Sequence, residues 1–370
     1  MSQPDMLRLT INANANANAN ANANATDATD AGRPRTADDV AQTALPKPSL
    51  RFSRRLAALA VRGGSFTAFL LILAVFAVAA PNFLSPGNIG NVFAQSAILG
   101  ILAFGLTVVI IGGGVNVVSG GIDLSLAANL GLSAAVYATL IKAGHGDTPA
   151  VAATLFTGLT IGAVNGCAVV LMRLPPLLAT LAMMNLVAGL ELVLTQNTVL
   201  PADSPLLSVL AGNGPLAVPV LAWVLLGVSA MLILLIQHTP FGLRLYAVGE
   251  YPEAARAGGI PVRFYIFISY LIGGFCAALA ALCSSAFFNG STTGSGDMLL
   301  SVVAIAYLGV MFSRRLTPTI TGSLLAALFI GFLINGFQLL NISNFWVNGV
   351  QGGLIICVVA ASTALRRRTV

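Results

Sequence analysis

Several polar residues lie inside long apolar runs. Their side chains are the groups that could bind a polar ligand or transfer a proton within those runs. Asp123 lies in the stretch GGIDLSLAAN at 120–129, and no lysine or arginine occurs within eighteen positions on either side. Ser125, Asn129 and Ser133 recur every four residues, so they would follow one face of a helix. In lipid such groups are costly unless they face a cavity or a partner. The pattern predicts either hydrogen bonds between helices or the lining of a path for a polar solute.

Asp123 itself has two compatible interpretations. At the start of a helix it would be stabilised by the helix dipole and by unpaired N–H groups. Alternatively, GGGVNVVSGG at 112–121 is a broken, re-entrant turn, and Asp123 lines a gate with Asn116 and Ser119. Residues 93–143 number 51, enough for two spans plus about eleven residues at about 20 per span. The length therefore permits both arrangements.

Two other apolar runs also carry polar residues. Glu191 is a carboxylate within such a run, so it should be buried against a partner or water. Asn185 lies in the same run, and Asn335 and Gln338 are spaced like neighbours on one helix face. For the Asn and Ser residues, hydrogen bonding between helices is the alternative to lining a pathway. The candidate pathway residues are Asn116, Ser119, Asp123, Ser125, Asn129, Asn185, Glu191, Asn335 and Gln338.

The composition indicates which elements position these residues. The chain is 57% hydrophobic and only 8% charged, whereas soluble domains carry roughly 25% charged residues. Its apolar runs are near the length of about 20 residues that one helix needs to cross a bilayer. They are continuous, whereas β-barrel strands alternate. We therefore predict an all-α polytopic membrane protein with about ten transmembrane helices. The predicted spans are 65–84, 93–113, 122–142, 150–172, 177–196, 216–236, 264–285, 298–313, 318–340 and 346–364.

The loop charges predict an orientation with both termini in the cytoplasm. With ten alternating spans, almost all basic residues fall inside, and the only basic residue between spans on the outer side is Lys142. The acids Asp147, Asp203 and Asp297 fall outside. The net charge of +6 is therefore a topology signal and does not indicate nucleic acid. The inside arginines are Arg51, Arg54, Arg55, Arg62, Arg173, Arg244, Arg256, Arg263, Arg314, Arg315, Arg366, Arg367 and Arg368.

The chain divides into three segments. Residues 1–62, which include an Asn-Ala repeat at 12–25, cannot bury a core and are predicted to be a disordered tail without a cleavable signal peptide. Residues 63–365 form the transmembrane domain, and 366–370 form a basic C-terminal tail. A weak echo between GIDLSLAANLG and SGDMLLSVVAIAYLG at 295–309 suggests a possible internal repeat.

The loop at 238–263 is the most hydrophilic stretch between the spans. Glu253 and Arg256 are at helical spacing, Pro252 suits the first turn of a short helix, and Gly258 and Gly259 would end it. Such a helix at the cytoplasmic surface would be a docking element for another protein. The alternative is an ordinary charged loop.

Four motifs carry a resemblance to a known family. The loop reads FG-x-R-x-YAVG-x-x-x-EAAR-x-x-GI from residue 241, and GGIDLS precedes the third span. PPLLATLAMM stands at 175–184, and FW at 345–346 is followed by QGGLIICV. In their order along the chain, these motifs resemble the ribose-type ABC sugar permeases over about residues 65–365. The chain departs from that family at Leu126-Ala127-Ala128, where Val-Gly-Ser is usual, and at GVMFSRRLTPT (309–319), where a Gly/Ser-rich turn is common.

The resemblance implies the membrane-spanning subunit of an importer in the bacterial inner membrane, carrying a ribose-like pentose or a similar sugar or polyol. It implies three partners: an ATP-binding subunit, a periplasmic sugar-binding protein and a second permease copy, identical or related. ATP and Mg²⁺ would bind the partner, so no cofactor or metal is expected in this chain. The residues of the ATPase-coupling loop would be Gly242, Arg244, Tyr246, Gly249, Glu250, Glu253, Ala254, Ala255, Arg256 and Gly258.

The sequence contains no recognisable enzymatic site. A phosphate-binding Walker loop needs Gly-Lys-Ser/Thr, and neither Lys47 nor Lys142 has that context. An ion-coupled secondary transporter of a small polar solute is the alternative function. It would need several intramembrane acids, whereas this chain offers Glu191 and Asp123.

Overall fold

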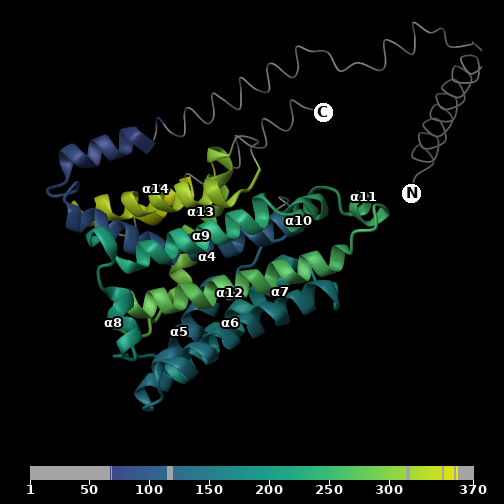
Figure 1. The fold of residues 1–370 in the computed structure, drawn as a ribbon, viewed down its shortest axis with the longest axis horizontal. Helices are drawn as coiled ribbons and strands as arrows, with labels where there is room; N and C mark the ends of the chain where they lie inside the picture. Colours follow the sequence, from purple (N-terminus) through teal and green to yellow (C-terminus); the bar gives the residue numbers. More distant parts are fainter. Residues whose placement is uncertain are drawn as a thin grey trace, which may run out of the picture. The chain divides into compact units, whose positions relative to one another are not determined.

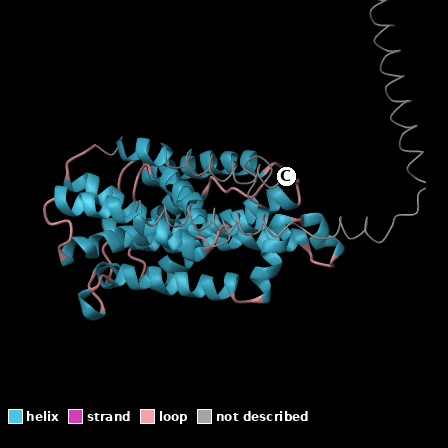
Figure 2. Ribbon diagram, turned by 90° about the horizontal axis from the view of Figure 1, so that it is seen from above, coloured by secondary structure: helices cyan, strands magenta, loops and turns pink. Residues whose placement is uncertain are grey.

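The structure, a computed structural model, is described for Thr67, 69–114, 120–313, 317–343, 346–353 and Ile356. Figure 2 shows helices joined by loops throughout this part of the chain. The two predicted tails, the candidate residues Asn116 and Ser119, and Arg314 and Arg315 lie outside the described residues.

The helices follow the predicted spans. Among the described residues, seven helices are long and apolar enough to cross a membrane, and two shorter apolar helices are Phe69–Ala79 and Leu126–Lys142. Each of the first nine predicted spans overlaps one of them, which confirms the all-α polytopic fold, whereas the span at 346–364 is described only in part. The labelled elements are α4 (Pro86–Gly113), α5 (Leu126–Lys142), α6 (Asp147–Val170), α7 (Pro176–Thr195), α8 (Pro205–Ala211), η1 (Pro215–Ala217), α9 (Val220–Gln237), α10 (Pro240–Glu250), α11 (Pro252–Ala257), α12 (Val262–Phe288), η2 (Ser295–Asp297), α13 (Met298–Phe312) and α14 (Ile320–Leu339).

Helices α4 and α12 form the centre of the bundle. In α4, 94% of the apolar span is buried, against 22% in α7, so α4 is enclosed by other helices while α7 is peripheral. α12 packs against α4, α5 and α6. Figure 1 shows α12 between α4 and α9 on one side and α5, α6 and α7 on the other. Any group on the inner face of α12 is therefore shielded from lipid.

Glycines bring α6 close to α12. A Cβ on Gly158 would lie 2.6 Å from the carbonyl oxygen of Gly274, and a Cβ on Gly274 would fall against Gly158. Gly162, one turn further along α6, likewise packs on the backbone of Tyr270. Small residues at such spacing let membrane helices approach to backbone contact. This contact sets the position of the polar residues that follow on both helices.

Aromatic contacts fasten the helix Phe69–Ala79 to α14. Phe69 lies 5.4 Å from Phe329 between ring centroids, in an edge-to-face arrangement. Phe76 lies 5.5 Å from Phe337, also edge to face. Such pairs add about 0.5–1.5 kcal/mol each beyond their burial.

One end of the bundle gathers the loops that the charge pattern assigns to the cytoplasm. The hydroxyl of Tyr246 on α10 donates to the carbonyl oxygen of Pro318, 2.7 Å away. Gly249 packs against Ile111 in the last turn of α4. We name this the basic end, after its arginines Arg173, Arg244, Arg256 and Arg263.

The opposite end, which we name the acidic end, holds the other loops. Asn88 at the start of α4 and Asn335 near the end of α14 exchange hydrogen bonds of 2.8 and 2.9 Å. Tyr137 of α5 donates to Asp147 of α6 over 2.6 Å. Successive membrane helices therefore run antiparallel, as the alternating loop charges predict. That the basic end faces the cytoplasm stays a prediction.

The α6–α12 contact can be tested with one added methyl group. Gly158→Ala would place a Cβ 2.6 Å from Gly274 O and 2.7 Å from Ala278 Cβ, so the helices must separate. We expect a loss of about 1–3 kcal/mol in stability, as in other overpacked cores, measured as a lower melting temperature in detergent. Gly189→Ala on α7 is the control, because nothing lies within 4 Å of its added Cβ. Equal melting temperatures for the two variants would contradict the contact.

Candidate functional site

Residues 120–125, which lead into α5, lie inside the bundle. Gly120, Gly121 and Asp123 are all buried. A Cβ on Gly121 would fall against the carbonyl oxygen of Val109 and lie 2.8 Å from Gly113 Cα. Val109 is one turn before the end of α4, so the returning chain runs beside the last turn of that helix. The described part of this segment thus has the course expected of a re-entrant turn.

The Asp123 carboxylate is enclosed by hydrogen-bond donors. Asp123 is only 1% exposed to solvent. Oδ1 accepts from the backbone N–H of Ser125 at 2.9 Å and from the Ser125 hydroxyl at 2.7 Å. Asn165 Nδ2 on α6 lies 3.3 Å from both carboxylate oxygens and 2.7 Å from Ser125 Oγ. Donors of this kind offset part of the cost of burying a carboxylate without a cation.

The interpretation of Asp123 as the cap of the third membrane helix is wrong. α5 begins at Leu126, its N-cap is Ser125, and no side chain caps it. Asp123 lies outside the helix because its carboxylate accepts the N–H two residues ahead, in the manner of an Asx turn.

The face of α5 that follows is bonded to α6. Asn129 Nδ2 donates to the carbonyl oxygen of Gly158 at 3.2 Å, and Ser133 Oγ donates to Asn129 Oδ1 at 3.1 Å. All of these residues are buried. For Asn129, the hydrogen bond between helices, one of the two alternatives, is therefore present in the structure.

Two residues of this site were missed by the sequence analysis. Asn165 binds Asp123 from α6, and Tyr270 lies on α12 where its backbone packs on Gly162, one turn before Asn165 on α6. Tyr270 is about 12 Å along α12 from its first residue, at about 1.5 Å per residue. The Tyr270 hydroxyl and Asn165 Oδ1 are buried without a hydrogen-bond partner. We call Asp123, Ser125, Asn165 and Tyr270 the Asp123 cluster.

Glu191 forms a separate polar site near the acidic end. The residue is 3% exposed, which confirms the predicted burial. Ser295 in η2 donates to Glu191 Oε2 at 3.2 Å, while Oε1 is buried without a partner. Gly131 of α5 leaves room for both side chains, because a Cβ there would fall against each of them. The carboxylate thus joins α5, α7 and η2.

Three candidate pathway residues lie away from both sites. Asn185 is exposed and donates to Leu181 O of its own helix at 2.9 Å. Asn335 is bound to Asn88, as described above. Gln338 is exposed. The candidate residues therefore do not form one continuous polar line, because the helix faces that carry them point to different neighbours.

The segment 238–263 is more ordered than the sequence indicated. The predicted short helix is α11, with Pro252 in its first turn and Gly258 as C-cap. It is preceded by a second helix, α10, which the sequence pattern does not predict. Arg256 binds both carboxylate oxygens of Glu253 at 3.0 and 2.9 Å on the exposed surface. Arg244 Nη1 donates to the Tyr265 hydroxyl at 3.4 Å.

The predicted coupling residues divide into two groups. One group fixes the segment to the bundle: Gly242, Tyr246, Gly249 and Ala255 pack against neighbouring elements or are buried. The other group is exposed, and it consists of Arg244, Glu250, Glu253, Ala254, Arg256 and Gly258. The exposed group is available to a partner protein, and the first group connects it to the ends of α4 and α14.

Comparison with known proteins agrees with this architecture. The family described as branched-chain amino acid transport system, permease component, matches residues 88–359. The ribose import permease protein RbsC of Escherichia coli (strain K12) is 32% identical over 301 residues, covering 80% of this chain and 91% of the relative. The L-arabinose ABC transporter permease protein AraH of Azospirillum brasilense is 28% identical over 299 residues, covering 80% and 86%. The D-allose transport system permease protein AlsC of E. coli (strain K12) is 30% identical over 307 residues, covering 80% and 90%.

These relatives are transport subunits rather than enzymes, and they do not favour the alternative of an ion-coupled secondary transporter. The family match over residues 88–359 includes α5 through α14, with the turn at Asp123 and the α10–α11 segment. The chain therefore belongs to the family of branched-chain amino acid transport system permease components, within which it is a ribose-type ABC sugar permease.

Proposed function

We propose that this chain is the membrane-spanning subunit of an ABC importer that carries a ribose-like monosaccharide, or a similar sugar or polyol, into the bacterial cell. The single observation that carries the proposal is similarity to ribose, arabinose and allose permeases along 80% of the chain. A second permease copy and a periplasmic sugar-binding protein complete the proposed importer, and ATP and Mg²⁺ bind only to a separate ATPase subunit.

The proposed mechanism is mechanical. The ATPase subunit docks on the exposed residues of α10 and α11, and its closure moves these helices. Gly249 transmits the movement to the last turn of α4, because it packs against Ile111 there. The turn that carries Asp123 folds back along the same part of α4. The partner can drive this change only by binding one of the two states more tightly than the other.

The Asp123 cluster acts in this proposal as the gate of the sugar path. Two of its buried groups, the Tyr270 hydroxyl and Asn165 Oδ1, are unpartnered. Each such group costs about 1–3 kcal/mol. In a second conformation these groups would form hydrogen bonds with other protein groups or with sugar hydroxyls. Those bonds would offset the free energy needed to leave the conformation described here.

The overall function is tested by transport. Vesicles that contain this chain, its ATPase and its binding protein should accumulate labelled ribose only when ATP is present. Unlabelled arabinose and allose, added in turn, determine which sugar competes best. Uptake that is independent of ATP and follows an ion gradient would contradict the importer.

The docking of α11 is tested by exchanging its two charges. Glu253→Arg with Arg256→Glu keeps an ion pair within the helix but reverses the charge at each exposed position. We expect loss of co-purification with the ATPase subunit and loss of uptake, with little change in melting temperature. Lys142→Glu, a charge reversal at the last turn of α5, is the control. Association and uptake that survive the exchange would remove α11 from the docking surface.

The gate is tested by removing the unpartnered hydroxyl of Tyr270. If that hydroxyl finds a partner only in another conformation, Tyr270→Phe should raise the melting temperature while lowering uptake about tenfold, since 1.4 kcal/mol corresponds to a factor of ten. Ser284→Ala is the matched control, because Ser284 is also a buried hydroxyl without a partner on α12. It should gain stability without losing uptake. Normal uptake by Tyr270→Phe would exclude Tyr270 from the gate.

A further inference from the structure

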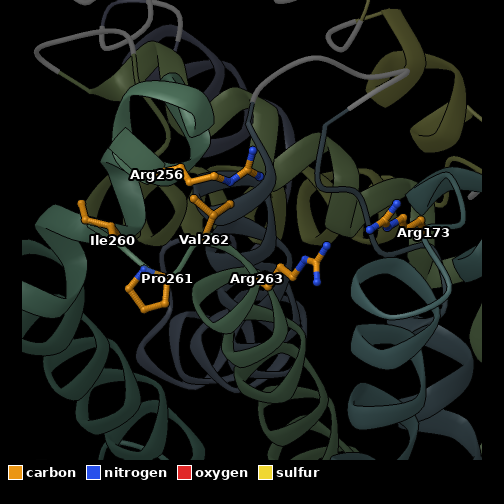
Figure 3. A pocket seen from close by; sticks show the side chains of 6 residues that line it. All are labelled: Arg173, Arg256, Ile260, Pro261, Val262 and Arg263. Atoms are coloured by element: carbon orange, nitrogen blue, oxygen red, sulfur yellow. The ribbon is translucent and has the colours of Figure 1, made fainter. Parts of the chain in front are cut away.

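A cavity of about 680 Å³ opens at the basic end between elements far apart in the sequence. Arg173 comes from the loop between α6 and α7, Arg256 from α11, and Arg263 from the first turn of α12. Ile260, Pro261 and Val262 complete its wall. Figure 3 shows the three arginine side chains arranged around the same opening.

The positive charge of this cavity is not balanced within the described part of the chain. The pair between Arg256 and Glu253 is the one ion pair found there, so Arg173 and Arg263 have no acidic partner among those residues. Two helix N-termini add to the field: α7 starts at Pro176, three residues after Arg173, and α12 starts at Val262. Neither is capped by a side chain, and helix N-termini carry partial positive charge. The cavity is thus built to attract an anion.

Arg173 is held in place by its backbone. Its φ angle of 57° is left-handed, a conformation that residues with a Cβ adopt only where the surrounding turn fixes it. The turn is closed by hydrogen bonds from Met172 N to Cys167 O and from Leu174 N to Ala168 O. The guanidinium therefore extends from a fixed turn instead of a mobile loop.

Exposed apolar side chains flank the arginines. Leu171 and Met172 precede Arg173 and are 70% and 69% exposed. Leu174 follows it, and Phe264, next to Arg263, is 54% exposed. Cations beside apolar surface at the ends of membrane helices match a phospholipid, whose phosphate meets the charge while its chains cover the apolar groups. A free phosphate would leave this apolar surface uncovered.

We propose that this cavity binds the phosphate headgroup of an anionic phospholipid through Arg173 and Arg263, with Arg256 at its rim. The proposal does not depend on the identity of the transported sugar. It adds a lipid ligand to the same end of the molecule that carries α11.

The test measures lipid binding to the purified full-length chain in a neutral detergent. Short-chain phosphatidylglycerol is titrated, and its affinity is taken from the rise in melting temperature. Short-chain phosphatidylcholine and sodium phosphate are titrated separately. We expect stabilisation by phosphatidylglycerol alone. In the double variant Arg173→Gln with Arg263→Gln the affinity should fall about 30-fold, because each arginine near an anionic lipid surface contributes roughly a fivefold gain.

Three control variants make the result decisive. Lys142→Gln removes one positive charge from the last turn of α5 and should bind phosphatidylglycerol like the unmodified chain. Arg173→Lys with Arg263→Lys keeps the charge and should keep most of the affinity. If the double glutamine variant does not fold, Arg263→Gln alone should weaken binding about fivefold.

Three outcomes would overturn the proposal. Equal stabilisation by phosphatidylcholine would remove the anionic specificity, and equal stabilisation by sodium phosphate would identify a free anion as the ligand. Unchanged phosphatidylglycerol affinity in the double glutamine variant would exclude the cavity. If the same variant lost association with the ATPase subunit while keeping its lipid affinity, the arginines would belong to the protein-docking surface. That last result would leave the transport function itself intact.

Discussion

The close contact between α6 and α12 is the constraint on which the rest of the structure depends. Gly158 and Gly274 let the two backbones meet, and no side chain could be inserted between them without moving a helix. One to two turns away from this contact, Asn165 on α6 donates to the Asp123 carboxylate, and Tyr270 lies on the turn of α12 that packs on Gly162 of α6. A buried carboxylate without a cation needs such donors nearby. The glycines therefore make the polar cluster possible.

The polar cluster and the surface of the molecule are connected through α4. The last turn of this helix contacts Gly249 of α10 on one side and Gly121, two residues before Asp123, on another. Both contacts are between backbones, so they have little freedom to adjust separately. In the mechanism proposed above, a displacement of α10 would therefore also move the turn at Asp123, because both pack on the last turn of α4.

The sequence predicts well what depends on local patterns. Apolar run length places nine of the helices, and the proline and glycines around 252–259 delimit α11 because they act within one turn. It predicts poorly what depends on the register between distant helices. Ser295 is 104 residues from Glu191, and Asn165 is the only amide side chain in a run whose other polar residues are threonines, so the local pattern does not mark either residue. The sequence does not predict α10, because its buried face consists of only Gly242, Leu245 and Val248 and is interrupted by polar residues.

The described state leaves the cluster incompletely bonded, and this has a consequence for mechanism. Asn165 directs its amide nitrogen to Asp123 and Ser125, which leaves Oδ1 without a donor, and the nearby Tyr270 hydroxyl is without a partner. An interior this tightly packed does not deform continuously, so the cluster can reach other partners only when whole helices shift. Because Asn165 Oδ1 and the Tyr270 hydroxyl have no partners to lose, such a shift costs less energy, and the contact between Gly158 and Gly274 stays as it is. A tightly packed frame around an incompletely hydrogen-bonded cluster is consistent with the gate proposed above.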